Sequence, residues 1–152
     1  MKNNRLIIEQ LDKRFIALNE FQKYSVASEG WIKTIRKALR MSLRQLAERL
    51  SVSAQNVKKL EQGEAEGSIS LKKLKEMAEA LDMKLVYSFV PKDGTLDKLI
   101  EKKAVQKAKE IVMRTSNTMK LEDQGNSDER LQKAIAQRAE MIKQELPKYL
   151  WD

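Results

Sequence analysis

Side chains able to read DNA bases gather between residues 54 and 59. Gln55 and Asn56 carry the amides that pair through two hydrogen bonds with the edge of adenine, and Lys59 suits the acceptors of guanine. Val57 and Leu60 are apolar at helical spacing, so one face of this segment should be buried and the polar residues should lie outside. The pattern predicts base contacts by Ala54, Gln55, Asn56 and Lys59.

Two short helices must position these side chains. Ser42 can cap a first helix in a capping box with Gln45, and Ser53 can cap a second helix after a turn of three residues. A helix, a tight turn and a second helix form the unit that sets the second helix into the major groove of DNA. The apolar face of the first helix comprises Leu43, Leu46, Ala47 and Leu50.

Positive charge is concentrated around the same segment. Between Trp31 and Leu60 there are eight basic residues and one acidic residue, so this stretch carries +7 of the net +8 of the chain. A helical hairpin with an apolar seam also occurs in proteins that never touch nucleic acid, and each cation taken singly fits an ordinary solvated face. The concentration of charge favours DNA. The predicted phosphate contacts are Lys33, Arg36, Lys37, Arg40, Ser42, Arg44 and Lys58.

The composition argues against an enzyme. The 152 residues include neither histidine nor cysteine, which removes the commonest general base, the usual zinc ligand and thiol chemistry. No glycine-rich phosphate loop is present, so we expect no catalytic residue, no metal and no cofactor. The sequence has no apolar run of about 18 residues and no start typical of a signal peptide, so we expect a cytoplasmic protein without a membrane partner.

Hydrophobic periodicity divides the chain into four parts. Residues 1–29 should form an N-terminal helix with an apolar stripe, 30–82 the helix-turn-helix domain, 83–94 a strand and turn, and 95–152 a helical arm. Glu64–Ser70 is expected to be a loop. The arm has 12 basic and 10 acidic residues, so it gains little from phosphate. Its apolar stripes fit core or dimer packing, and the alternative is docking of a different protein. The N-terminal stripe comprises Ile7, Leu11, Phe15, Leu18 and Phe21.

One segment has the composition of a β-strand. Met83–Val90 is rich in branched and aromatic residues, and Pro91–Gly94 ends it. A lone strand leaves its backbone groups unpaired, and the same strand of a second subunit, antiparallel about a two-fold axis, would satisfy them. The predicted fold class is therefore all-α with one β-strand and an intersubunit β-ribbon. The expected dimerisation residues are Leu85, Val86, Tyr87 and Phe89.

Part of the chain resembles a known family. Trp31–Leu85 is similar to the Xre, or phage-repressor-like, helix-turn-helix family through Ser42–Leu50 and Leu60–Gly63. The resemblance implies a phage-repressor-like domain, here with N- and C-terminal helical extensions. Ser51 stands where the family usually has glycine in the tight turn, and serine tolerates the turn at a conformational cost. Leu43 stands where a glutamine that contacts DNA usually opens the helix.

A second resemblance covers nearly the whole chain. Gly30–Ile32, Glu64–Leu71, Leu85–Tyr87 and Leu150–Asp152 are similar to the family called mobile mystery protein A. Members of that family lie beside a partner with a Fic domain, a domain that transfers nucleotidyl groups to hydroxyls. The resemblance implies a repressor that binds its double-stranded DNA operator and acts as the antitoxin of a Fic-type toxin. The unpaired strand separately predicts that this repressor is a homodimer. The alternative is a stand-alone Xre-family transcription regulator whose C-terminal arm only stabilises the dimer.

The same resemblance suggests an inhibitory residue. Fic inhibitors often carry Ser or Thr, three residues, Glu and then Gly or Asn on a helix, and the glutamate pairs with a catalytic arginine. Thr118 and Glu122 match the first five positions, and Asp123 stands at the sixth. Glu122 is therefore the residue that the resemblance implies as toxin-inhibitory, with chance occurrence as the alternative.

Overall fold

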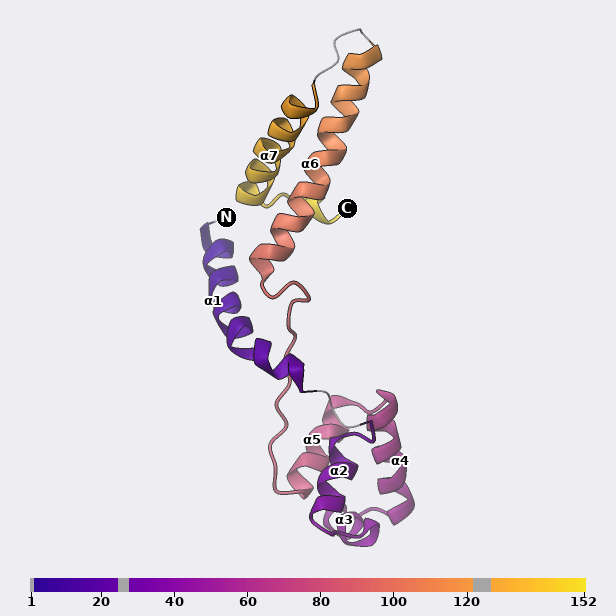
Figure 1. Cartoon of the computed structure of the whole chain (residues 1–152). Helices are drawn as coiled ribbons and strands as arrows, with labels where there is room; N and C mark the ends of the chain where they lie inside the picture. Colours follow the sequence, from indigo (N-terminus) through magenta and orange to yellow (C-terminus); the bar gives the residue numbers. More distant parts are fainter. Residues whose placement is uncertain (1, 25–27, 122–126) are drawn as a thin grey trace. The chain divides into compact units, whose positions relative to one another are not determined.

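Helices make up the regular structure of the computed structural model, which describes residues 2–24, 28–121 and 127–152. The chain divides into two compact units, one combining Met1–Phe21 with Phe89–Asp152 and the other comprising Gln22–Ser88 (Figure 1). Each unit has its own hydrophobic core. The elements are α1 (Lys2–Leu18), η1 (Asn19–Lys23), α2 (Trp31–Ala38), α3 (Leu43–Leu50), α4 (Ala54–Glu66), α5 (Leu71–Ala80), α6 (Leu96–Leu121), α7 (Asp128–Glu145) and η2 (Lys148–Trp151).

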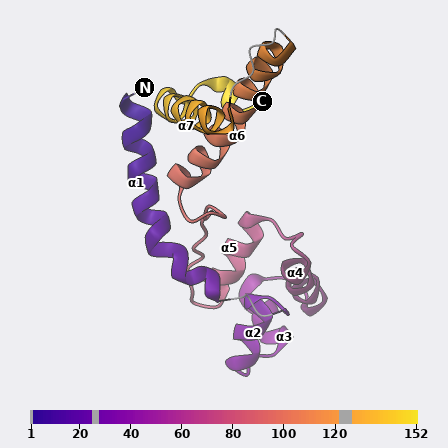
Figure 2. The same ribbon diagram turned by 45° about the horizontal axis from the view of Figure 1, so that its top comes forward.

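The unit of residues 22–88 packs α2 to α5 around an aliphatic core (Figure 2). Leu46 of α3, Val57 of α4 and Met77 of α5 are fully shielded from solvent. Burying one such side chain contributes about 1.5–3 kcal/mol. Ser42 and Ser53 cap α3 and α4 as the sequence predicts. The unit therefore has the helix-turn-helix arrangement.

The helix α4 is longer than the sequence indicated, because it continues through Gly63 to Glu66. An internal glycine costs a helix about 1 kcal/mol. Glu64 ties this part of α4 to α2, because its carboxylate accepts a hydrogen bond of 2.8 Å from the backbone N–H of Ile32. Gly67 ends the helix in the left-handed region, with φ 77°. The expected loop from Glu64 to Ser70 was wrong in its first half: it begins at Gly67.

In the other unit, α6 and α7 form an antiparallel hairpin, and α1 packs against α6 (Figures 1 and 2). Alanines at the contact let the two hairpin helices approach closely. Ile8 of α1 packs against this core, whereas Ile7 of the expected stripe is 46% exposed. Leu11, Phe15 and Leu18 of the predicted stripe are half-buried. The prediction was therefore wrong at the two ends of the stripe, at Ile7 and at Phe21, which is 69% exposed. The buried core comprises Ile100, Ala104, Ala108, Ile135, Ala139, Ile142 and Leu150.

The start of α6 is held by a carboxylate from α1. Asp12 is buried and accepts hydrogen bonds from the backbone N–H groups of Leu96, at 2.7 Å, and Asp97, at 3.1 Å. Thr95 accepts a third, from the N–H of Lys98 at 3.1 Å. The first amides of a helix have no partner within it, and an anion near them also interacts favourably with the helix dipole. The N-terminal helix therefore caps a helix 84 residues further along the chain.

The segment from Met83 to Val90 has no regular structure, and no strand occurs among the described residues. A strand is defined by its hydrogen-bonded partner, and a single chain contains no second copy of this segment. The β-strand and the intersubunit ribbon therefore stay predictions. Leu85 is half-buried, whereas Val86, Tyr87 and Phe89 are 79%, 67% and 86% exposed.

Candidate nucleic-acid interface

The first two turns of α4 present a polar surface. Val57 is buried under this surface, and Ser53 fixes the start of the helix by accepting a hydrogen bond of 3.1 Å from the N–H of Asn56. The side chains of Gln55 and Asn56 make no hydrogen bond, and Lys59 makes no ion pair, within the described part of the chain. Their polar groups are thus available to a ligand. The exposed residues are Ala54, Gln55, Asn56, Lys58 and Lys59.

The tight turn before α4 places this surface. Ser51 adopts the left-handed conformation, with φ 54° and ψ 42°, which glycine adopts at lower cost. The N–H of Val52 donates a hydrogen bond of 3.0 Å to the carbonyl of Ala47, which closes the end of α3. The sequence therefore located the turn correctly, and the conformational cost expected for serine is present.

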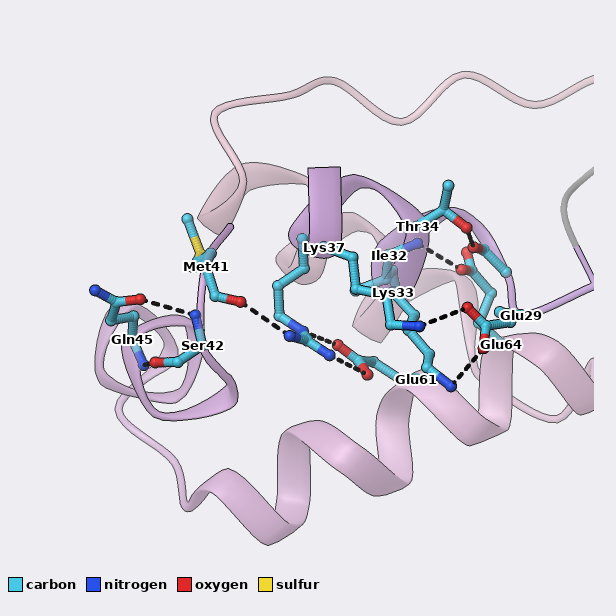
Figure 3. Close-up of polar contacts among 12 residues, drawn as sticks. Glu29, Ile32, Lys33, Thr34, Lys37, Met41, Ser42, Gln45, Glu61 and Glu64 are labelled. Atoms are coloured by element: carbon cyan, nitrogen blue, oxygen red, sulfur yellow. Dashed lines mark hydrogen bonds and ion pairs between the residues drawn. The ribbon is translucent and has the colours of Figure 1, made fainter. Parts of the chain in front are cut away.

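A capping box fixes the start of α3. The N–H of Ser42 donates to the side chain of Gln45 at 2.8 Å, and the N–H of Gln45 donates to the Ser42 hydroxyl at 3.1 Å (Figure 3). Ser42 is exposed and can still donate from its hydroxyl to a phosphate. Arg44 lies on the same exposed turn, 86% exposed, and pairs with Glu48 at 3.1 Å. An exposed pair of this kind exchanges readily with a phosphate, because it contributes at most about 1 kcal/mol.

Arg36 does not lie where a phosphate contact needs it. Its side chain is 11% exposed and pairs with Glu61, which is 4% exposed. The Nε and Nη2 groups of Arg36 donate to the two carboxylate oxygens of Glu61, the second at 3.2 Å, and Nη1 donates to the carbonyl of Met41 at 2.9 Å. The structure therefore corrects the predicted phosphate contact: Arg36 joins α2 to α4 and to the turn before α3.

Two further cations share one acidic partner. Lys33 and Lys37 lie one turn apart on α2 and contact the two carboxylate oxygens of Glu29, at 2.9 and 3.2 Å (Figure 3). Hydrogen bonds from Lys33, and then from Lys37, lower the pKa of Glu29 below its ordinary value. The two ammonium groups are therefore held side by side, at 35% and 56% side-chain exposure, where they can also reach solvent.

Several basic side chains of residues 31–60 are paired with acidic residues, which the count of charges along the sequence did not show. Glu29, Glu61 and Asp82 lie outside residues 31–60 in the sequence, and each pairs with a basic residue inside that stretch. Asp82 forms an ion pair with Arg49, with 3.0 Å between its Oδ2 and the Nη1 of the arginine. Of the cations among the predicted phosphate contacts, Arg40 and Lys58 make no ion pair within the described residues.

Sequence reasoning missed how the start of α2 is built. Gly30 has φ 84°, and a Cβ atom there would collide with the carboxylate of Glu64. That carboxylate accepts the hydrogen bond from Ile32 already described (Figure 3). Glycine at residue 30 therefore leaves room for the group that caps α2. The sequence signal that could have indicated this arrangement was a lone glycine directly before an apolar helical stripe.

Other possible sites are not supported by the described residues. Among them, no group of three or more acidic, histidine or cysteine side chains could hold a metal ion, and no helix is long and apolar enough to span a membrane. Thr118 is exposed, and its hydroxyl donates to the carbonyl of Arg114 at 3.1 Å. Glu122 lies outside the described residues, so the proposed inhibitory pair is untested.

The four-helix unit with its exposed α4 defines a helix-turn-helix DNA-binding domain. Residues 32–88 match the Xre-type helix-turn-helix family HTH_3. That family consists of DNA-binding regulators, so the domain is that of a DNA-binding transcription regulator. No curated protein and no solved structure matches the chain.

Proposed function

We propose that the chain is a sequence-specific transcriptional repressor in which α4 enters the major groove. The observation that carries the proposal is the exposed, unpaired set of Gln55, Asn56 and Lys59 on the first turns of α4. These side chains have the donors and acceptors that base edges require. Ala54 precedes them and is small enough to let the helix end approach a thymine methyl group.

The experiment is selection of a preferred site from random duplexes, followed by affinity measurements at one salt concentration. Asn56→Ala should weaken binding to the selected site by about 1–3 kcal/mol and relax the preference at one position. Gln62→Ala is the matched control, since Gln62 is an exposed amide on the same helix that bonds Glu66 instead. Equal losses on selected and random DNA would instead assign Asn56 to the backbone.

The phosphate contacts of this proposal are Lys33, Lys37, Arg40, Ser42, Arg44 and Lys58. Replacing Lys33 and Lys37 together by alanine should weaken binding to all sequences and reduce the slope of log affinity against log salt by about 1.8, or about 0.9 for each phosphate. Lys102 and Lys109, exposed lysines of α6, provide the matched double variant. An unchanged slope for Lys33 and Lys37 would remove them from the interface.

The proposed repressor is a homodimer. A dimer with two copies of α4 fits an operator with two-fold symmetry, whose half-sites are about 34 Å or one helical turn apart. The support is that the apolar segment around Val86 and Tyr87 is exposed. The same segment is rich in the branched and aromatic residues typical of a strand. Selected sites should therefore be palindromic, and a change in half-site spacing should weaken binding.

The proposed regulator also acts as the antitoxin of a Fic-type toxin. The support is the whole-chain resemblance and the balanced charge of residues 95–152, which makes them a poor ligand for phosphate. The test is co-purification of a Fic-domain protein encoded beside this chain with the full chain and with residues 28–88 alone. Retention by the full chain only would support the antitoxin role. If neither form retains such a protein, and residues 28–88 alone lose operator binding, the alternative remains: a stand-alone regulator whose arm stabilises the dimer.

A further inference from the structure

An apolar groove lies in the unit of residues 22–88. Its lining includes Trp31 at the start of α2, Leu74 and Ala78 of α5, and Leu85 and Val86 of the segment that follows α5. Its volume is about 330 Å³. Trp31 is 53% exposed and Val86 is 79% exposed, although both lie beside the core. Water therefore covers a large apolar surface in the single chain, and such surfaces mark interaction sites.

The backbone beside this groove is also unpaired. The N–H of Met83 donates to Ala78 at 2.8 Å, but the N–H groups of Lys84, Leu85, Val86 and Tyr87 have no acceptor within the described chain. An extended, apolar segment with open N–H and C=O groups is a template for pairing with another strand. A partner that pairs with this segment must supply extended backbone, and a partner that fills the groove must supply apolar side chains.

We infer that this groove is the seat of a second copy of the chain. In a two-fold dimer, residues 84–87 of the two copies pair antiparallel, and apolar side chains of each segment cover the Trp31 groove of the other copy. The inference rests on the proposed homodimeric regulator and specifies the surface that joins its subunits. Tryptophan is the side chain that most often dominates the energy of such a contact.

A second copy fits this surface better than other occupants. A two-fold interface uses the same patch on both subunits, and this patch supplies the open strand and the groove side by side. Of the charged groups on the groove, the Glu64 carboxylate already accepts from Ile32, and Lys84 is the other. With so little net charge, the groove offers nothing that would attract nucleic acid.

The test uses the full-length chain and its two tryptophans. Trp151→Phe leaves Trp31 as the only tryptophan, so its emission should shift to shorter wavelength as the concentration rises and the groove closes. Sedimentation should then report twice the 17.6 kDa of one chain. Trp31→Ala and Val86→Asp should each weaken dimerisation by about tenfold or more. Trp151→Ala, which removes an equally exposed tryptophan from the other unit, should leave it unchanged.

The result that would overturn the inference is a monomer at tens of micromolar, or a dimer that neither Trp31→Ala nor Val86→Asp weakens, since its interface would then lie elsewhere. Binding to a single half-site separates this outcome from failure of DNA reading. A Trp31→Ala monomer that still binds one half-site supports both ideas. Absence of DNA binding by every variant would remove the proposed function, while the sedimentation data would still decide the interface.

Discussion

The ion pair between Arg36 and Glu61 gives the sharpest prediction, because sequence and structure assign Arg36 different roles. The two side chains are 11% and 4% exposed and share two hydrogen bonds, and Arg36 also donates to Met41. Removing one partner leaves the other charge buried, which costs about 3–5 kcal/mol. Replacing both by apolar residues of similar size costs much less, because no charge is then stranded.

The expected loss is large for a unit of this size. A helical unit the size of Gln22–Ser88 has roughly 3–10 kcal/mol of unfolding free energy. Glu61→Met or Arg36→Met alone should therefore bring the unit close to unfolding, whereas the double variant should recover most of its stability. The assay is urea unfolding followed by the emission of Trp31 in the Trp151→Phe chain, at one protein concentration because dimerisation contributes to apparent stability.

Arg36→Met also separates the two roles directly. A phosphate contact would leave the unfolding midpoint unchanged and reduce the salt slope of DNA binding by about 0.9. A variant with the original midpoint and a smaller slope would refute the structural role and restore the role expected from the sequence. A double variant whose loss of unfolding free energy equals the sum of the two single losses would likewise show that the two side chains are not coupled.

Three further outcomes are expected. Gly30→Ala should destabilise the chain by about 1–3 kcal/mol, and by more than Gly67→Ala in the same unfolding assay, because both glycines have positive φ but only a Cβ at residue 30 meets Glu64. The hydrogen bond to Asp97 raises the pKa of Lys143 above its ordinary value of 10.5. The pair should therefore contribute fully to stability below pH 10.5, and this contribution should be lost as the pH rises through the higher folded-state pKa. Lys143→Met should abolish this part of the loss of stability at alkaline pH in urea titrations. Asp12→Ala should cost about 1–3 kcal/mol and speed hydrogen exchange of the first amides of α6, whereas unchanged exchange would show that Asp12 is not their cap.

Local patterns predicted the helix-turn-helix well because the signals are local. Ser42, Gln45 and Ser53 act within three residues of their own positions, so their caps can be read from spacing alone. The exposed side of α4 followed equally from the periodicity around Val57. The same reasoning placed Ser51 in the turn, where the structure has the left-handed conformation.

Contacts between distant residues were beyond the reach of these patterns. The pairing of Arg36 with Glu61 spans 25 residues, and the capping of α6 by Asp12 spans 84. A count of charges along the chain cannot tell a buried pair from a free cation. The stripe of α1 was wrong at Ile7, because Ile7 and Ile8 are both apolar and only packing in the folded unit decides which of the two is covered.

The order of the elements along the chain has a consequence for splitting the protein. The chain leaves the unit that contains α1, forms residues 22–88, and returns to the same unit at Phe89. A cut between Lys92 and Asp93, within the turn that the N–H of Gly94 closes on the carbonyl of Pro91, would leave α1 and the DNA-binding unit on one fragment and α6 and α7 on the other. Asp12 and Ile8 would still recognise the second fragment. Co-expressed halves should therefore reassemble. Expressing or withholding the second fragment would then decide whether the DNA-binding unit carries the helical hairpin.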